Sequence, residues 1–357
     1  MARRALKPYT TNRLPIPCNE KGLFMIRIAI NGYGRIGRCL LRAIHEQGLA
    51  DRVQVVAIND LADFDVLTHL TRHDSTHGPF MTPVERDGDH LKVGEQSIAL
   101  LAQPELDQLP WHTLKVDVVL ECTGLFKKRE ALARHLDAGA GRVLASHPVG
   151  DADRTVVYGI NHDELITDDR VVSNASCTTN CLAPVVKVLD DAFGVVQGQM
   201  TTIHSYTNDQ NLIDKAHRDL YRARAAASNM IPTRTGAADS VGRVLPALAG
   251  KLDGMAVRVP TINVSMVDLH AILATGADVD AINAAMKRAS EGSLRGVLGY
   301  SDEPLVSVDF NHSPFSAIHD AGQTRVLGTQ AKVLAWYDNE WGFTNRMLDV
   351  ACVMAQQ

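Results

Sequence analysis

The sequence has no apolar run of 18 or more residues, and its first 24 residues contain no apolar core of a secretory signal. It also lacks a strong excess of either charge, because the formal net charge is -5 and the isoelectric point is near 6.3. A membrane span is therefore not expected, and neither a nucleic-acid partner nor an anionic membrane surface is indicated. We predict a globular, cytoplasmic protein.

Cysteine is too sparse for the disulfide framework of a small secreted domain. The six cysteines among 357 residues are Cys18, Cys39, Cys122, Cys177, Cys181 and Cys352. Free thiols are predicted. The closest pair, in CTTNC, has neither a C-x-x-C spacing nor a second Cys/His cluster, so no metal site is predicted. Two interpretations of this pair remain: one cysteine is a nucleophile and the other takes no part, or both are buried structural thiols.

Short β-branched runs alternate with helical patterns in the first half of the chain, from IRIAI at 26–30 to RVLASHP at 142–148. This alternation predicts a parallel sheet with crossover helices. From about residue 176 to 337, longer alternating stretches such as GQMTTIHSYT and AKVLAWYDN predict a mixed or antiparallel sheet. The predicted fold class is α/β, with an α+β second domain. Residues 1–24 are predicted to be a disordered extension or to precede the true start at Met25.

The segment INGYGRIGR follows a predicted strand and opens a predicted helix, with G-x-G-x-x-G spacing. Its predicted cofactor-binding residues are Gly32, Gly34, Arg35, Ile36 and Gly37. The glycines permit a tight turn and let the backbone approach a pyrophosphate at the helix N-terminus. Asp60 ends the next predicted strand, about 20 residues later, where a carboxylate meets the adenosine ribose hydroxyls. A carboxylate there repels a 2′-phosphate, so NAD is predicted in preference to NADP.

A cysteine acts as a nucleophile in its thiolate form, which a helix N-terminus and a nearby imidazolium both favour. Ser176 and Thr178 are placed to cap a helix that continues through LAPVVKVLDDAFG, with a kink expected at Pro184. Cys177 then lies at the positive end of the helix dipole, and Cys181 lies one turn deeper. Among fourteen histidines, His204 in TTIHSYTNDQ is the candidate base, although the sequence does not place it beside Cys177.

These segments, together with ECTG, TGAA, RVPTINVSMVDL and WYDNEWGF, resemble the phosphorylating glyceraldehyde-3-phosphate dehydrogenase superfamily. The resemblance runs from about Ile26 to the C-terminus. It implies a Rossmann-type NAD-binding domain over residues 25–175, completed by a C-terminal helix at 338–357, and a catalytic domain over 176–337. It also implies NAD as the cofactor and a homotetramer.

The resemblance further implies that Cys177 is the nucleophile, that Cys181 is a bystander and that His204 is the base. It implies two anion sites, one for the phosphate of an aldose substrate and one for the attacking inorganic phosphate. The first is implied to contain Thr207 and Arg258, with Asp209 nearby. The second is implied to be shaped by Ser176, Thr178, Arg222, Thr235 and Gly236. Asn339 matches a residue that bonds the nicotinamide carboxamide, and Phe343 matches an aromatic that backs the ring.

Two members of the superfamily remain open. SHP at 146–148, DSTHG at 74–78 and PLVSVDFNHSPFSAI resemble erythrose-4-phosphate dehydrogenase, whereas HSYTNDQ and TRTGAA resemble glyceraldehyde-3-phosphate dehydrogenase. We expect the second set to form the phosphate sites and the first set to lie at the periphery. Oxidation of glyceraldehyde 3-phosphate to 1,3-bisphosphoglycerate is therefore predicted, with formation of 4-phosphoerythronate as the alternative.

Two further points bear on this prediction. Lys215 stands where NAD-specific triose enzymes usually have leucine, and its charge would weaken the exclusion of NADP. An NAD-binding regulator or thiol sensor without turnover is the alternative from another class. The joint presence of Cys177, His204, Arg258 and Asn339 argues against it, since a non-catalytic protein has no chemical need of that set.

Overall fold

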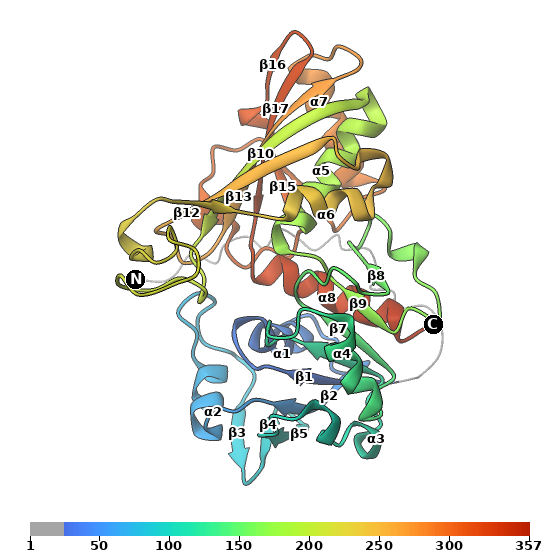
Figure 1. The fold of residues 1–357 in the computed structure, drawn as a ribbon, viewed down its shortest axis with the longest axis vertical. Coiled ribbons are helices and arrows are strands. Elements are labelled where there is room, and N and C mark those ends of the chain that lie inside the picture. The colour runs from blue at the N-terminus through green and yellow to red at the C-terminus, as the bar shows by residue number, and fades with distance from the viewer. Residues whose placement is uncertain (1–24) are drawn as a thin grey trace.

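The structure is a computed structural model that describes residues 25–357, so the predictions for residues 1–24 lie outside it. It contains two β-sheets with helices packed around them, one sheet in the blue and green part of the chain and one in the yellow to red part (Figure 1). The α-helices are α1 (Arg35–Glu46), α2 (Phe64–Arg72), α3 (Trp111–Leu114), α4 (Arg129–Asp137), α5 (Cys177–Phe193), α6 (Ala237–Val244), α7 (Val279–Glu291) and α8 (Trp341–Met354).

The first sheet has nine strands in the order β3-β4-β5-β2-β1-β6-β7-β9-β8. Its strands are β1 (Ile26–Asn31), β2 (Val53–Asn59), β3 (Val84–Asp87), β4 (His90–Val93), β5 (Gln96–Leu101), β6 (Val118–Glu121), β7 (Arg142–Ala145), β8 (Arg154–Thr155) and β9 (Val171–Ser173). All pairs from β5 to β8 are parallel, and only the β3-β4-β5 edge is antiparallel. The carboxyl ends of β1, β2 and β6 therefore meet at one edge, where ligands bind in such sheets.

The second sheet is mixed and has eight strands, seven in the order β11-β12-β10-β13-β17-β15-β14, with β16 paired to β17. Its strands are β10 (Val195–Ser205), β11 (Ile231–Arg234), β12 (Leu252–Val259), β13 (Ser265–Leu273), β14 (Leu298–Ser301), β15 (Ala317–Asp320), β16 (Arg325–Leu327) and β17 (Gln330–Tyr337). Strands β10 and β12 run parallel, while β10, β13 and β17 are antiparallel neighbours.

The elements of the first sheet form where the local pattern predicts them. The apolar runs IRIAI and VQVVAIN become β1 and β2, and the periodic segment after the glycine turn becomes α1. Asp63 caps α2 because its carboxylate accepts from the N–H groups of Asp65 and Val66. The predicted α/β fold class, with a mixed second sheet, is confirmed.

Helix α8 returns the end of the chain to the first sheet. It packs on α1, β6 and β7, and Figure 1 shows it between the two sheets. Almost all of its side chains are buried, including Met347 and Val350. Because β17 belongs to the second sheet and leads directly into α8, the residues between them, Asp338 to Glu340, reach the space between the sheets. No helix within residues 25–357 is both long and apolar enough to span a membrane.

Candidate active site

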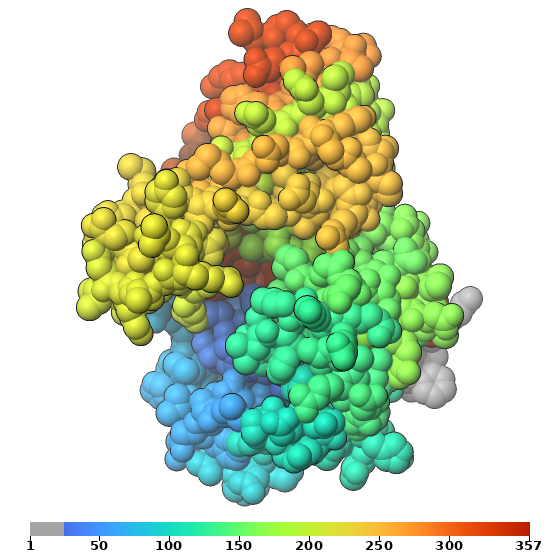
Figure 2. Space-filling view, viewed as in Figure 1, coloured from blue at the N-terminus to red at the C-terminus, as the bar shows by residue number. Residues whose placement is uncertain are grey.

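A pocket of about 660 Å³ is lined by loops that follow strands of the first sheet, by residues of the second sheet, and by the starts of α1, α5 and α8. In Figure 2 the surface is hollowed between the yellow segment near residues 206–230 and the blue and green part of the chain. Of the residues predicted from the sequence, the structure places in the lining Gly34, Arg35, Ile36, Ser176, Cys177, His204, Thr207, Asp209, Arg258, Asn339 and Phe343. The predicted residues that do not line it are Gly32, Gly37, Asp60, Thr178, Arg222, Thr235 and Gly236.

The glycine turn is built for close backbone packing. Gly32 has a φ of +89°, and a Cβ there would lie 2.6 Å from the backbone nitrogen of Thr123. A Cβ on Gly37 would lie 2.4 Å from the carbonyl oxygen of Gly32. Gly34, at the N-cap of α1, would meet nothing within 4 Å, so its open side leaves room for a ligand at the helix N-terminus.

Asp60 holds this turn from the end of β2. Its Oδ2 accepts from the N–H of Tyr33 at 2.7 Å, and its Oδ1 accepts from the N–H of Ala62 at 3.0 Å. Each carboxylate oxygen has a second lone pair, so these bonds leave acceptors for a ribose diol. The carboxylate is thus fixed beside the glycine turn.

Cys177 is the first residue of α5, and Ser176 is its N-cap, with Oγ accepting from the N–H of Thr179 at 3.0 Å. The predicted capping role of Thr178 is wrong, because its hydroxyl is buried and bonds the Tyr337 hydroxyl at 2.9 Å. The helix continues past Pro184 to Phe193. The Cys177 sulfur therefore lies at the positive end of the helix dipole.

The second cysteine is inert by burial. Cys181 is fully buried, its Sγ lies 3.9 Å from the carbonyl oxygen of Ala335, and burial raises the pKa of its thiol well above the usual value. The free thiols among the described residues are Cys39, Cys122, Cys177 and Cys181.

Strand register brings the candidate base to the cysteine. His204 lies at the end of β10 and pairs in register with Arg258 on the parallel strand β12. Its Nε2 lies 3.5 Å from the sulfur of Cys177. Its Nδ1 lies 2.7 Å from the carbonyl oxygen of Ser205, and Nη1 of Arg258 lies 2.9 Å from the same oxygen. The Ser205 carbonyl only accepts and so favours a proton on Nδ1, whereas Nη1 of Arg258, 2.8 Å from Nδ1, only donates. The tautomer with the proton on Nδ1 is the one in which Nε2 presents a lone pair to the thiol.

Both members of this pair are neutral in the structure. Burial, and then the positive charge of Arg258, lower the pKa of His204 to about 3. Burial raises the pKa of the Cys177 thiol, and Arg258 opposes this rise. The expected imidazolium partner is therefore absent from the resting site, because burial disfavours every charged form. What favours the thiolate instead is the guanidinium together with the helix N-terminus.

Three residues that the sequence did not point to, Tyr337, Ser205 and Ser265, support the side chains of the site. Tyr337, at the end of β17, packs edge-on against the His204 ring, with centroids 5.9 Å apart, and its hydroxyl bonds Thr178 and Thr202. Ser205 and Ser265 lie behind Asn339, and their hydroxyls donate to its Oδ1 at 2.9 and 2.8 Å. The Asn339 amide is thereby oriented with its N–H₂ group left to donate.

The arginine predicted for the second anion site is held by its own carboxylate partner. Arg222 forms an ion pair with Asp209, and its Nε donates to the hydroxyl of Thr233 at 3.0 Å. Thr235 and Gly236 lie at the N-terminus of α6, where backbone N–H groups favour an anion. These residues stand beside the pocket, apart from the Cys177 sulfur.

The motif SHP lies in the pocket, so its expected peripheral position is wrong. Ser146, His147 and Pro148 line the pocket because they follow β7 at the carboxyl edge of the first sheet. His147 is buried, and its Nε2 donates to the carbonyl oxygen of Phe126 at 2.7 Å. Ser75 and Thr76 of DSTHG also line the pocket. Sequence alone did not show this, because the two motifs are far from Cys177 along the chain.

One group among residues 25–357 has the spacing of metal ligands. Cys39, His77 and Glu340 each place a ligand atom within 4.8 Å of the others. However, Arg35 donates to both carboxylate oxygens of Glu340, at 2.8 and 2.5 Å. The positive charge of the guanidinium in that position repels a metal cation, so this group carries no argument for a metal site.

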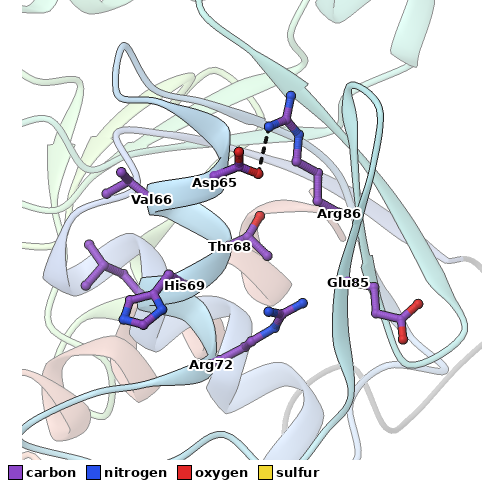
Figure 3. A pocket seen from close by; sticks show the side chains of 8 residues that line it. Asp65, Val66, Thr68, His69, Arg72, Glu85 and Arg86 are labelled. Atoms are coloured by element: carbon purple, nitrogen blue, oxygen red, sulfur yellow. Dashed lines mark ion pairs between the residues drawn. The ribbon is translucent and has the colours of Figure 1, made fainter.

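A second, shallower hollow lies over α2 and β3, away from Cys177 (Figure 3). Its polar side chains include Arg86, which pairs with Asp65 at 2.8 Å. It holds neither a cysteine nor a converging set of buried polar groups. It therefore lacks the features of a catalytic site.

Comparison with known proteins agrees with this geometry. Residues 26–129 match the model of the glyceraldehyde 3-phosphate dehydrogenase NAD binding domain, and residues 176–339 match that of the C-terminal domain. The chain is 58% identical to glyceraldehyde-3-phosphate dehydrogenase of Pseudomonas aeruginosa over 92% of this chain and 98% of the relative. It is 56% identical to the plasmid-encoded glyceraldehyde-3-phosphate dehydrogenase of Cupriavidus necator (92% and 98%) and 54% identical to that of Xanthobacter flavus (93% and 99%). The chain belongs to the glyceraldehyde-3-phosphate dehydrogenase family.

Proposed function

We propose that the protein oxidises glyceraldehyde 3-phosphate with NAD and inorganic phosphate, forming 1,3-bisphosphoglycerate and NADH. The observation that carries this proposal is the contact of 3.5 Å between the Cys177 sulfur and Nε2 of His204, beside Arg258 and in one pocket with the glycine turn. This combines a nucleophile, a base and an anion-binding group at a dinucleotide site.

The residues present fit NAD. The open side of Gly34 at the start of α1 suits a pyrophosphate, and the Asp60 carboxylate suits a ribose diol. At the other end of the pocket the Asn339 amide suits the nicotinamide carboxamide, and Phe343 suits the nicotinamide ring. When bound there, NAD supplies the acceptor for the hydride that leaves the substrate.

In the first step Cys177 adds to the aldehyde carbon. Its thiol proton passes to Nε2 of His204, the C–S bond forms, and the proton moves on to the carbonyl oxygen, giving a thiohemiacetal. His204 is unprotonated here, because burial and Arg258 lower its pKa to about 3, and the negative charge that forms on the sulfur opposes this lowering as the proton arrives. Arg258 and the N-terminus of α5 stabilise the sulfur while it is negative.

In the second step His204 takes the hydroxyl proton of the thiohemiacetal while the hydride leaves its carbon. The aldehyde carbon is thereby oxidised by two electrons to a thioester on Cys177. The buried position of His204, with Tyr337 packed against its ring, keeps water from competing for the proton.

In the third step inorganic phosphate attacks the thioester carbon, and the C–S bond breaks. The Cys177 thiolate leaves and regains its proton from His204, while the acyl phosphate departs. Thr207 and Arg258 bind the substrate phosphate. Ser176, Thr178, Arg222, Thr235 and Gly236 form the site of the attacking phosphate, in which Arg222 exchanges its Asp209 partner for the anion.

Three broader predictions belong to the same proposal. The NAD-binding domain covers 25–175 with 338–357, and the catalytic domain covers 176–337. The protein is a cytoplasmic homotetramer. Exposed apolar side chains in one loop support assembly: Leu212, Ile213, Leu220 and Met230. Size-exclusion chromatography with light scattering tests the assembly, and a monomer at micromolar concentration contradicts it.

The test of the function is NADH formation from glyceraldehyde 3-phosphate as inorganic phosphate is varied. Turnover that rises with phosphate and saturates supports the proposal. Turnover that is indifferent to phosphate, and faster with erythrose 4-phosphate, supports the alternative that releases 4-phosphoerythronate. We include this alternative because His147, from a motif that resembles erythrose-4-phosphate dehydrogenase, lines the pocket. NAD binding without turnover on either aldose identifies a regulator.

A further inference from the structure

A chain of charged side chains runs from the molecular surface to the dinucleotide end of the pocket. Its members, in order of contact, are Glu46, His312, His77, Glu340, Arg35 and Asp74, here termed the histidine-carboxylate network. Residues from α1, from the loop after α2, from the loop before β15 and from the start of α8 meet in it. The mechanism above uses none of these side chains, and of the set only Arg35 is a predicted cofactor-binding residue.

The hydrogen bonds of the two histidines fix how many protons they share. His312 Nε2 lies 2.7 Å from a carboxylate oxygen of Glu46, and His77 Nε2 lies 3.1 Å from one of Glu340. The two Nδ1 atoms face each other at 3.1 Å. Each carboxylate only accepts, so the ring nitrogen that faces it carries a hydrogen. The contact between the two Nδ1 atoms needs one more hydrogen, so the two rings carry three N–H groups between them. One ring is therefore an imidazolium.

His312 is held in a backbone conformation that side chains rarely adopt, with a φ of +67°. Four contacts keep it there. Its N–H donates to the carboxylate of Asp338 at 2.6 Å, its ring stacks on Trp341 at 3.7 Å, and its two ring nitrogens make the bonds to Glu46 and His77. Strain that is maintained by so many contacts points to a functional constraint.

The inner end of the network forms part of the pocket wall. Arg35 and Glu340 line the pocket, and so do Ser75 and Thr76. The loop that carries Ser75 and Thr76 is folded on Asp74, whose Oδ1 accepts from the N–H groups of Thr76 and His77 at 2.8 and 2.9 Å. Asp74 in turn binds the Arg35 guanidinium at the N-terminus of α1. A shift of His77 would therefore move the wall on which the dinucleotide rests.

Charge decides which protonation state suits a dinucleotide. Burial opposes ionisation of Asp74, but Arg35 and the backbone N–H groups outweigh it and lower the pKa of its carboxyl to about 2. Glu340 is also kept ionised, since Arg35 and His77 lower its pKa against the effect of burial. The network then holds the carboxylates of Glu46, Glu340 and Asp74 and one guanidinium. The imidazolium supplies its second positive charge. Its loss leaves the wall more negative, which disfavours an anionic pyrophosphate.

Other charged or titratable groups also face the two histidines. The Asp338 carboxylate accepts from the backbone of His312, and the Cys39 thiol lies beside His77 and Glu340. Burial raises the pKa of Cys39 well above its usual value, so this thiol remains neutral. Asp338 bonds only backbone N–H groups in the contacts described.

We propose that His77 and His312 are positioning residues for the dinucleotide, and that the proton they share favours NAD binding. The positive charge of the pair offsets the carboxylates of the network, so loss of the ring contacts weakens NAD binding. This inference rests on the proposed NAD site, and it adds a positively charged support behind Arg35 and Glu340.

The test uses the full-length enzyme. The dissociation constant for NAD without aldose is measured together with KM for NAD and kcat, at the same pH and ionic strength for every variant. His312→Gly removes the ring contacts and relaxes the positive φ, so it should fold. Glu46→Gln keeps the shape of the acceptor and removes its charge. His90→Gln, on the exposed surface of β4, is the matched histidine control.

His312→Gly should weaken NAD binding on the order of 3- to 10-fold, the equivalent of one net hydrogen bond, with kcat unchanged within about twofold. Glu46→Gln should weaken it less, because the imidazolium loses a charged partner but the contacts between the rings remain, and His90→Gln should match the wild type. The inference is overturned if His312→Gly binds NAD as tightly as the wild type, or if only its thermal stability or its kcat changes. A wild-type protein that fails to bind NAD overturns the proposed function as well.

Discussion

The two halves of the site are built in different ways. At the dinucleotide end the backbone sets the shape, because Gly32 and Gly37 leave no space for a side chain and Asp60 ties the turn to β2. At the catalytic end side chains from separate elements converge, with Cys177 from α5, His204 from β10 and the adjacent Arg258 from β12. The first half is thus local in sequence, and the second depends on sheet register.

This difference also appears in the electrostatics. The turn around Asp60 has its donors and acceptors paired, whereas Cys177 and His204 are both neutral and Nε of Arg258 has no hydrogen-bond partner among the described groups. The backbone-built half should tolerate side-chain changes with graded losses of affinity. The catalytic half should lose turnover sharply when one member is removed.

The largest effect is expected from Cys177→Ser, which should reduce NADH formation by at least about 10³-fold, because a hydroxyl is a far weaker nucleophile than a thiolate. NAD binding should remain. Cys181→Ser, one turn along the same helix, is the control and should keep a burst of NADH in stopped-flow measurements. If Cys181→Ser lost the burst and Cys177→Ser kept it, the reactive sulfur would be that of Cys181.

Replacing the base should come next. His204→Gln should lower kcat on the order of 10²- to 10⁴-fold, since general-base assistance has that size. Acylation should slow but remain detectable in a single turnover. If the variant retained the wild-type kcat, the contact of 3.5 Å between Nε2 and the Cys177 sulfur would have no catalytic meaning.

The two arginines should separate the two anion sites. A hydrogen bond between charged groups contributes about 1.5–3 kcal/mol, or roughly 10- to 150-fold in transition-state binding. Arg222→Ala should therefore raise the KM for inorganic phosphate, and Arg258→Ala should raise the KM for the aldehyde phosphate. Arg224→Ala removes an exposed arginine of the same loop, paired with Asp214, and is the matched control. An equal effect of Arg222 and Arg258 on both KM values would argue against two distinct sites.

The pH dependence of alkylation should expose the resting state of the thiol. Burial raises the pKa of Cys177, so its reactive thiolate appears at higher pH than that of an ordinary cysteine. In the empty enzyme the iodoacetamide rate should rise about tenfold per pH unit through neutral pH, without a plateau there. A plateau already present near pH 6 would show a preformed thiolate and contradict the neutral pair.

The smallest effect is expected at the ribose. Asp60→Asn keeps an acceptor for the N–H of Tyr33 and removes the charge that opposes a 2′-phosphate. The ratio of kcat/KM for NAD to that for NADP should fall about fivefold, as expected for one screened charge near the surface. Asp60→Gly should lower this ratio too, and it should weaken NAD binding more than Asp60→Asn does. A wild-type preference for NADP would contradict the charge argument and direct attention to Lys215.

The sequence determined the features that depend on neighbouring residues. The apolar runs set β1 and β2, the glycine spacing set the turn before α1, and Ser176 set the start of α5 with Cys177 in its first turn. These are local preferences of backbone conformation and capping, and so a short segment contains all the information. The motif resemblance extended them to the family and to the identity of His204.

Only the tertiary structure decided which distant residues meet. The register of β10 against β12 placed His204 opposite Arg258, and the return of α8 brought Asn339 to the same pocket. Burial made Cys177 and His204 neutral, engaged Thr178 with Tyr337 and put His147 in the pocket wall. None of this follows from spacing along the chain, because strand pairing and desolvation are set by contacts between segments that are far apart in sequence.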